Sequence, residues 1–244
     1  MDLIIKKMQG AITKIEDWSY KWVFKFSVDK TKTMFFTRKR IGSTVKLKLY
    51  NQELERVKQF KYLGVWFDER ITWAIHIQKV VDKCKKVLNV MRCLTGSEWG
   101  ADRTALKAIY CGSIRSILDY GCVVYGSAAS TSLKKLDNIQ YQAMRLCTGA
   151  LKTTPTAALQ VEMGEMPLDM RRLQISVTFW VNLQGHSQDH PTQNTLKPCW
   201  EKEKRDSKSF GWIVAQKAKE LEIAHLVLQY LCQLYHLGCF QMLQ

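Results

Sequence analysis

The side chains that could do chemistry in this sequence are few, and most of them are basic. Two sets of histidine and cysteine could be drawn as zinc sites: His186, His190 and Cys199, and Cys232, His236 and Cys239. Each set lacks a fourth ligand at ordinary spacing, so we expect no metal site at either place. The sequence contains no nucleophile elbow, phosphate-binding loop or dinucleotide-binding fingerprint. Its positive charge is the more informative feature.

The 244 residues carry a formal net charge of +15. The charge is uneven, because 21 of the 37 Lys and Arg but only 9 of the 22 Asp and Glu lie before residue 98. Such a distribution indicates a polyanionic partner, and a solvated lysine-rich surface is the alternative. The eight cysteines include no CxxC pair, and no secretory leader is visible. They favour free thiols inside the cell, in the nucleus or cytoplasm, rather than secretion.

The first seventy residues predict one helix followed by about four strands. Apolar residues recur at intervals of three and four up to Trp22, which is typical of an amphipathic helix. After it the period falls to two in FKFSV, MFF, VKLKLY and the stretch that ends at Phe67. Turns are expected at Asp29-Lys30 and Asn51-Gln52. We therefore expect a small antiparallel sheet over residues 23–68.

Beyond Trp73 the period changes to three and four, which predicts a mainly helical region. A long basic helix is expected over residues 75–92, followed by a second over about residues 101–125. Further helices are expected to end at Gly149, to run through TAALQVEMG after Pro155 as far as Gly164, and to begin at Pro167. The stretch 185–211 is polar and contains prolines, and the run after Trp212 is too polar to span a membrane. The predicted class is α+β, with regions 1–70 (helix and strands), 71–184 (helical), 185–211 (linker) and 212–244 (helical tail).

Residues 60–73, FKYLGVWFDERITW, place a glycine between two aromatic runs in an expected strand. Gly64 has no side chain, so another backbone could approach the strand closely there. Phe60, Tyr62 and Trp66 would then offer faces for stacking. The alternative is that Gly64 marks a β-bulge and that the aromatic rings belong to the core.

Three segments of the chain resemble the palm edge and thumb of reverse transcriptases from non-LTR retrotransposons, particularly jockey-like and related LINE elements of animals. Residues 22–36, with the KTK of Lys30 to Lys32, resemble motif D. YLGVWFD, followed by Trp73, His76 and Ile77, resembles the motif E turn and the start of the thumb. The third segment comprises LDYGCVVYG, LKKLDNIQYQAMRLCTGA and MPLDMRRLQ. The resemblance extends from residue 1 to about residue 215.

The resemblance implies a nucleic-acid partner, namely an RNA or DNA primer-template duplex. It implies that the Tyr62-Leu63-Gly64 turn holds the primer backbone, and that Lys30 donates a proton to the leaving pyrophosphate or screens its charge. Spacing alone favours the alternative that Lys30 and Lys32 are solvated lysines at the start of a strand. The residues expected to bind nucleic acid are Lys30, Lys32, Tyr62, Leu63, Gly64, Lys79, Lys83, Lys86 and Arg92.

The resemblance also implies what this chain does not carry. In the family, an Asp on one palm strand and an Asp-Asp pair on a hairpin hold two Mg²⁺ ions, but this sequence has no adjacent aspartates. Its nearest substitute, Asp68-Glu69, follows the YLG turn, where an acid at the start of a helix is expected. We therefore expect a truncated palm edge and thumb that binds no cofactor and cannot polymerise alone. The alternative is a non-enzymatic relic that binds the missing polymerase portion or another protein.

Overall fold

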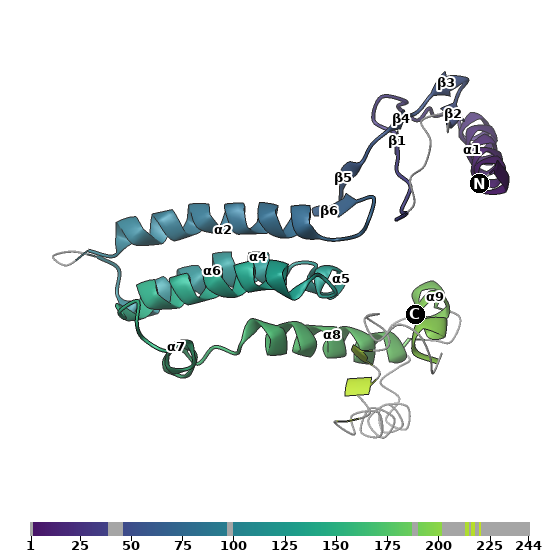
Figure 1. Cartoon of the computed structure of the whole chain (residues 1–244). Coiled ribbons are helices and arrows are strands. Elements are labelled where there is room, and N and C mark those ends of the chain that lie inside the picture. The colour runs from purple at the N-terminus through teal and green to yellow at the C-terminus, as the bar shows by residue number, and fades with distance from the viewer. Residues whose placement is uncertain are drawn as a thin grey trace. The chain divides into compact units, whose positions relative to one another are not determined.

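The computed structural model describes residues 2–38, 46–96, 100–186 and 190–201, together with 213, 214, 216, 217 and 220 (Figure 1). The chain divides into two compact units, Met1–His76 and Ile77–Gln244. All strands of the described residues lie in the first unit, and the described part of the second unit is helical. The predicted α+β class is confirmed.

The first unit begins with helix α1 (Asp2–Lys21), which packs on a small apolar core. Leu47, Leu49 and Leu54 are buried in this core, and the inner face of α1 covers them with Ile5, Met8 and Ile12. A polar anchor adds to the packing. The side-chain amide of Gln9 donates to the carbonyl of Lys48 at 2.9 Å and accepts from its N–H at 2.9 Å. The helix is therefore fixed to the neighbouring strand both by apolar burial and by the backbone of that strand.

Six short strands follow α1: β1 (Lys32–Thr33), β2 (Lys48–Leu49), β3 (Gln52–Glu53), β4 (Glu55–Arg56), β5 (Gln59–Tyr62) and β6 (Val65–Asp68). They form three separate pairs rather than the single antiparallel sheet that was expected. β2 pairs with β3 and β5 with β6 in antiparallel register, but β1 pairs with β4 in parallel register. The expectation was wrong on this point because a period of two reveals which residues share a face of a strand and leaves its pairing partner open.

Both hairpins turn on two residues with positive φ. Tyr50 and Asn51 join β2 to β3 with φ of 50° and 62°, and Leu63 and Gly64 join β5 to β6 with φ of 46° and 84°. Positive φ at both central residues is typical of a type I′ turn, whose twist matches that of the flanking strands. The first turn lies one residue earlier than the expected Asn51-Gln52.

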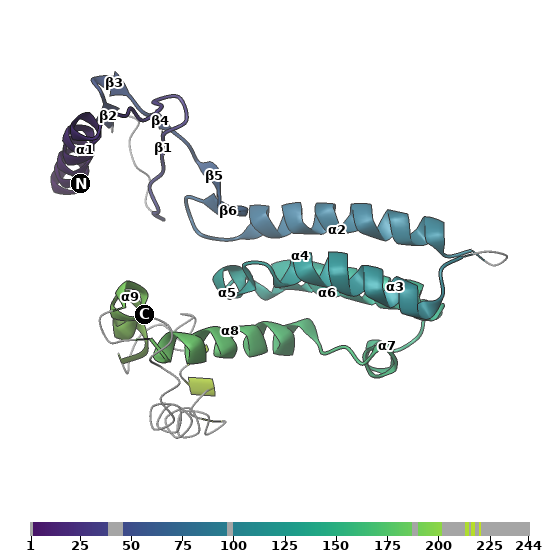
Figure 2. The same ribbon diagram turned by 180° about the vertical axis from the view of Figure 1, so that it is seen from behind.

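The second unit packs its helices in layers, as Figures 1 and 2 show for α2, for α3 and α4 with α6, and for α8. The helices are α2 (Ala74–Leu94), whose first turn lies in the first unit, α3 (Arg103–Ile109), α4 (Ser116–Asp119), α5 (Cys122–Tyr125), α6 (Ser130–Thr148), α7 (Thr156–Met163), α8 (Leu168–Gln184) and α9 (Pro191–Glu201). The core contains side chains that are 0% exposed, among them Leu88, Met91, Tyr110, Ile114 and Met144.

The helix expected over residues 101–125 is interrupted. Asp102 caps α3 by accepting the N–H of Ala105 at 2.9 Å. A π-helical turn, η1 (Tyr110–Arg115), then connects α3 to α4, and Gly121 with φ of 69° turns the chain into α5. The side-chain period of a π turn is close enough to that of an α-helix for the sequence to predict one continuous helix.

The expected helix limits at glycine and proline are confirmed in the second unit. Gly149 and Gly164 follow α6 and α7 with φ of 66° and 59°, and Pro155 and Pro167 directly precede α7 and α8. Residues 185–211, interpreted as a linker, contain helix α9. The domain limits at 184 and 211 stay predictions, and most of the tail 212–244 lies outside the described residues.

Two properties of the described residues bear on the setting of the chain. No helix among them is both long enough and apolar enough to cross a membrane. Five cysteines are described and all are free: Cys84, Cys122 and Cys147 are buried, Cys111 is partly buried and Cys93 is exposed. Burial raises the pKa of the Cys84 thiol to about 12, so this side chain behaves as a small apolar group of the core.

Candidate nucleic-acid interface

The outer side of α2 carries a row of three exposed lysines, Lys79, Lys83 and Lys86, which we call the lysine stripe. They follow one another at steps of four and three residues, which keeps them within about 60° of arc on a helix of 3.6 residues per turn. The inner side of α2 contains the buried residues Ile77, Cys84, Leu88 and Met91. Packing of this apolar side fixes the rotation of the helix, so the stripe faces solvent.

Two other cations of α2, Lys85 and Arg92, are exposed but lie on another side of the helix than the lysine stripe. Lys85 is about 100° or more from each stripe lysine, and Arg92 is about 120° or more away. Arg92 donates to Asn89 Oδ1 at 2.6 Å and to Gln142 Oε1 on α6 at 3.1 Å. The structure therefore does not place Arg92 with the lysines that the sequence grouped with it.

The β5–β6 hairpin answers the question raised by Gly64. The register runs without a break from Gln59 opposite Asp68 to Tyr62 opposite Val65, so the β-bulge is excluded. Glycine is required instead by the type I′ turn, in which Gly64 has φ of 84°. Leu63 occupies the other turn position with φ of 46°, which is uncommon for a side chain of its kind.

The aromatic side chains of this hairpin divide between core and surface. Tyr62 and Leu63 are 60% and 73% exposed, and all four residues of β5 are exposed. On β6 the ring of Phe67 packs against Trp73 at 5.3 Å and against Phe36 at 6.1 Å between ring centroids. Of the three rings named in the core alternative, Phe60 and Tyr62 are exposed and Trp66 is partly buried, so the hairpin presents apolar and aromatic surface to solvent.

The two lysines of the motif D-like segment have different surroundings. Lys30 is exposed in the turn that precedes β1. Lys32 lies on β1 and forms an ion pair with Glu55 on β4, with 2.5 Å between Nζ and Oε2. The exposed side chain of Lys30 can therefore contact an anion, whereas the charge of Lys32 is already paired with Glu55 on the neighbouring strand.

The acidic pair Asp68-Glu69 serves the loop that leads into α2. The Asp68 carboxylate accepts hydrogen bonds from the N–H groups of Arg70, Thr72 and Trp73 at 3.0–3.1 Å and from the Thr72 hydroxyl at 3.1 Å. Glu69 forms an ion pair with Arg56 at 3.0 Å. Both oxygens of Asp68 are engaged by donors, which is the chemistry of a structural acid and opposes a role as metal ligand.

The histidine of the W..HI segment also has a structural contact. His76 is buried, and its Nδ1 accepts the N–H of Trp66 at 3.3 Å. Burial lowers the pKa of His76 below 6.5, which favours the neutral ring that can accept this bond. His76 thereby ties strand β6 to the first turn of α2.

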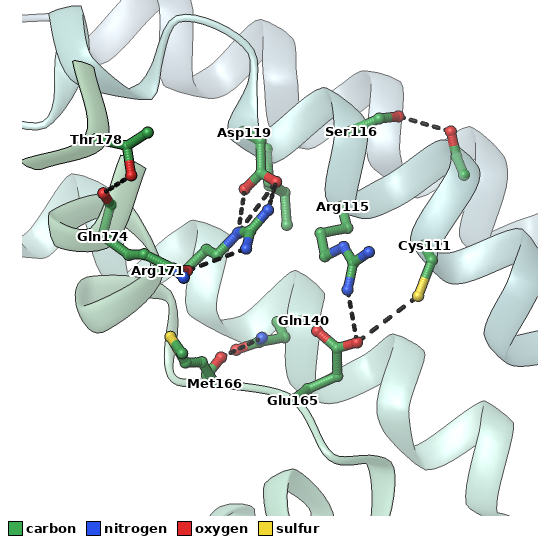
Figure 3. Close-up of polar contacts among 12 residues, drawn as sticks. Cys111, Arg115, Ser116, Asp119, Gln140, Glu165, Met166, Arg171, Gln174 and Thr178 are labelled. Atoms are coloured by element: carbon green, nitrogen blue, oxygen red, sulfur yellow. Dashed lines mark hydrogen bonds and ion pairs between the residues drawn. The ribbon is translucent and has the colours of Figure 1, made fainter. Parts of the chain in front are cut away.

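A polar network joins the LDYG and MPLDMRR segments, and sequence reasoning did not find it. Arg171 reaches Asp119 from α8, with 2.8 Å between Nη2 and Oδ2 and 3.2 Å between Nε and Oδ2 (Figure 3). Arg115 of the π turn forms an ion pair with Glu165 at 2.9 Å, and the Cys111 thiol donates to the same carboxylate at 3.6 Å. The network fastens the chain before α8 to the η1–α4 helices.

Gln140 completes the network from α6. Its amide nitrogen donates to the Met166 carbonyl at 3.0 Å (Figure 3) and to the Tyr110 hydroxyl at 3.3 Å. Tyr110 is 0% exposed, and burial raises its pKa, so the phenol stays neutral. The acidic, arginine and glutamine side chains of this network thus have packing roles, and their separation in sequence gave no signal of the contacts.

The histidine and cysteine residues drawn as zinc ligands are described only in part. The rings of His186 and His190 stack with 4.5 Å between centroids. The side chain of Cys199 and the whole of Cys232, His236 and Cys239 lie outside the described residues. Within the part of the chain that the structure describes, no three His, Cys, Asp or Glu side chains are grouped to hold a metal ion.

Comparison with known proteins identifies relatives of this chain. Over 58–59% of its length the chain is a distant homologue of RNA-directed DNA polymerases of non-LTR retrotransposons. It is 28% identical over 142 residues to the probable RNA-directed DNA polymerase from transposon BS of Drosophila melanogaster. It is 24% identical over 143 residues to the RNA-directed DNA polymerase from mobile element jockey of the same species.

A third relative is the retrovirus-related Pol polyprotein from type-1 retrotransposable element R1 of Nasonia vitripennis, with 29% identity over 116 residues, or 47% of this chain. The matched stretch spans 16% of the BS and jockey relatives and 34% of the R1 relative. No protein-family model and no solved structure matches the chain.

Proposed function

We propose that this chain is a primer-template-binding part of a retrotransposon-derived RNA-directed DNA polymerase, with the first unit as palm edge and the second as thumb. The observation that supports the proposal most is the lysine stripe of Lys79, Lys83 and Lys86 on the solvent side of α2. Because relatives of the chain are named as RNA-directed DNA polymerases, we infer that the polyanionic partner is a nucleic acid.

The dimensions of the stripe suit a nucleic-acid backbone. Lys79 and Lys86 are seven residues apart, which is about 10 Å along a helix that rises 1.5 Å per residue. Three cations in one row of this length can contact neighbouring phosphates of a nucleic-acid strand. Contacts to phosphates give affinity without sequence preference.

The β5–β6 hairpin supplies a different kind of contact in this proposal. Tyr62 and Leu63 present exposed aromatic and apolar surface at its tip, and Gly64 leaves the backbone of the turn uncovered. Such surface binds sugar and base through packing and stacking rather than charge. Lys30, exposed before β1, would add a phosphate contact.

The proposal assigns no nucleotidyl transfer to residues 1–244 by themselves. The sequence has no adjacent aspartates, and Asp68 is held by the N–H groups of its own loop. A primer-extension assay with Mg²⁺ or Mn²⁺ should show no incorporation above a control without protein. Incorporation that is lost in Asp68→Ala would contradict this assignment.

The lysine stripe is tested by a salt titration of binding to a fluorescent RNA–DNA hybrid, followed by anisotropy. The log–log slope of affinity against salt should flatten by about 0.9 for each phosphate contact removed. Lys83→Glu with Lys86→Glu should therefore weaken binding to every hybrid sequence and flatten the slope by about two. Lys85→Glu is the matched control, because it makes the same change of charge on another side of the same helix. Equal effects of Lys83→Glu and Lys85→Glu would overturn the stripe as the binding surface.

The contribution of the β5–β6 hairpin to binding is tested with a different variant. Gly64→Val would strain a turn that requires positive φ, so loss of binding in that variant could follow from misfolding. Tyr62→Ser leaves the turn intact and removes the exposed ring. It should weaken binding while leaving the salt slope unchanged, because no phosphate contact is lost. An unchanged affinity would exclude the hairpin from the interface.

A second candidate function, that of a protein-interaction module, is favoured by exposed apolar residues of α1 and the turn after it. Ile4, Ile15 and Trp18 are exposed beside the face of α1 that packs on the core, and Trp22 is exposed directly after the helix. Exposed apolar surface of this kind is typical of contact with another polypeptide. If the chain fails to bind the hybrid even at low salt, this second function becomes the better account.

A further inference from the structure

A basic cleft lies where the C-terminal ends of α2 and α6 meet. Its volume is about 720 Å³, which falls in the range of ligand-binding clefts. Three cations from three parts of the chain line it: Arg92 on α2, Arg145 on α6 and Lys152 in the segment that follows α6. The other lining residues, which include Thr95 and Gln142, are polar or apolar, and none is acidic.

Among the described residues, no carboxylate forms an ion pair with Arg92, Arg145 or Lys152. Arg92 donates to the side-chain oxygens of Asn89 and Gln142, which are uncharged. Nε of Arg145 is buried and has no hydrogen-bond partner within the described residues. A guanidinium N–H that is buried without an acceptor costs free energy, so the surrounding helices leave this donor of Arg145 unsatisfied. The cleft therefore combines uncompensated positive charge with an unsatisfied donor.

Stabilisation of the α6 dipole accounts for only part of this arrangement. Cations near the C-terminal end of a helix are favourable, and α6 ends at Thr148 close to Arg145 and Lys152. That effect requires neither Arg92, which comes from another helix, nor the burial of a guanidinium N–H without an acceptor. An anionic ligand accounts for the convergence of Arg92, Arg145 and Lys152 on one cleft.

We propose that the cleft binds a phosphodiester group of a nucleic-acid strand. Phosphate oxygens match the fork of donors on arginine and can accept from Arg145 and Arg92 together, with Lys152 as a point charge at the rim. Arg92 lies about 120° or more around α2 from the lysine stripe, so the cleft is a separate contact rather than an extension of it. The inference rests on the proposed function and adds a second anchoring point for the strand.

The test uses the full chain and two variants with equal loss of charge on α6 and its surroundings. Arg145→Gln with Lys152→Gln alters the cleft, and Lys134→Gln with Lys135→Gln alters the other end of α6. In the salt titration with the RNA–DNA hybrid, the cleft variant should flatten the log–log slope by about 1.8, at about 0.9 per contact, and weaken binding about five-fold per contact at 0.15 M salt. The control variant should leave the slope within experimental error of the parent.

A second measurement separates failure of the cleft from failure of the proposed function. Inorganic phosphate, compared with chloride at equal ionic strength, should raise the unfolding temperature of the parent and of the control variant more than that of the cleft variant. If the parent binds the hybrid and both variants weaken it equally, the cleft inference is overturned and the proposed function stands. If the parent binds no hybrid, the proposed function fails, and the phosphate shift decides whether the cleft is an anion site.

The single variant Lys152→Gln tests the cleft without disturbing the fold, because this side chain is exposed and lies outside the helices. It should flatten the slope by about 0.9 on its own. A slope equal to that of the parent, in a variant with the parent's unfolding temperature, would remove Lys152 from the contact and contradict the cleft as described.

Discussion

Replacing Asp68 tests whether the acidic pair after the hairpin organises a loop or serves catalysis. Asp68 is 7% exposed, and its carboxylate accepts hydrogen bonds from three backbone N–H groups and one hydroxyl of residues 70–73. In Asp68→Ala these donors lose their acceptor. Because Trp73 is buried, its N–H is the donor that water reaches least easily once the carboxylate is gone.

The magnitude follows from these bonds. Hydrogen bonds to a charged group contribute about 1.5–3 kcal/mol each, and donors near solvent recover much of that by binding water. With full loss at Trp73 and partial loss at Arg70 and Thr72, we expect Asp68→Ala to destabilise the loop by about 3 kcal/mol. Asp68→Asn keeps one acceptor oxygen and should cost about half as much.

Amide hydrogen exchange of residues 69–77, read by mass spectrometry of a peptide from that segment, measures this loss locally. A loss of 3 kcal/mol corresponds to exchange about 10²-fold faster in Asp68→Ala, and Asp68→Asn should lie between that variant and the parent. Mg²⁺ or Mn²⁺ should leave the exchange of the parent unchanged. Unaltered exchange in Asp68→Ala, or protection of this loop by Mn²⁺, would refute the structural role.

Two further predictions concern other buried polar groups. Because burial lowers the pKa of His76, the unfolded state takes up a proton below pH 6.5 while the folded state does not, so stability should fall as the pH is lowered from 6.5. Urea unfolding of His76→Asn should show a weaker fall over that range, and an equal fall in both proteins would contradict it. Arg171→Ala leaves Asp119 without its partner and should cost about 1.5–2 kcal/mol, between the values for exposed and buried ion pairs. Thermal unfolding measures this against Arg103→Ala, which removes the exposed ion pair with Glu162. Equal losses would show that the Arg171–Asp119 pair contributes no more to stability than a surface pair.

The helical unit could be predicted from sequence because its information is local. Buried residues of α2, such as Cys84, Leu88 and Met91, recur at three and four, and Gly149 and Gly164 mark the helix ends at which they were expected. The lysine stripe follows from the same period. Arg92 could have been separated from it on the same basis, since six residues from Lys86 is not a helical neighbour spacing.

The sequence does not predict which residues far apart in the chain contact one another. Asp119 and Arg171 are 52 positions apart, and nothing in either segment indicates the other as its partner. The parallel pairing of β1 with β4 and the meeting of Arg92 with Arg145 likewise depend on how elements pack. The π turn at Tyr110–Arg115 escaped prediction because it changes the backbone without a distinct residue pattern.

Lysine footprinting tests the central claim most directly. The chain is acetylated briefly with and without saturating RNA–DNA hybrid at low salt, and the reactivity of each lysine is read by mass spectrometry. We predict that the hybrid protects Lys79, Lys83 and Lys86 and leaves Lys85, on another side of the same helix, as reactive as before. Equal protection of Lys85 and the stripe, or no protection of any of the four, would contradict the account.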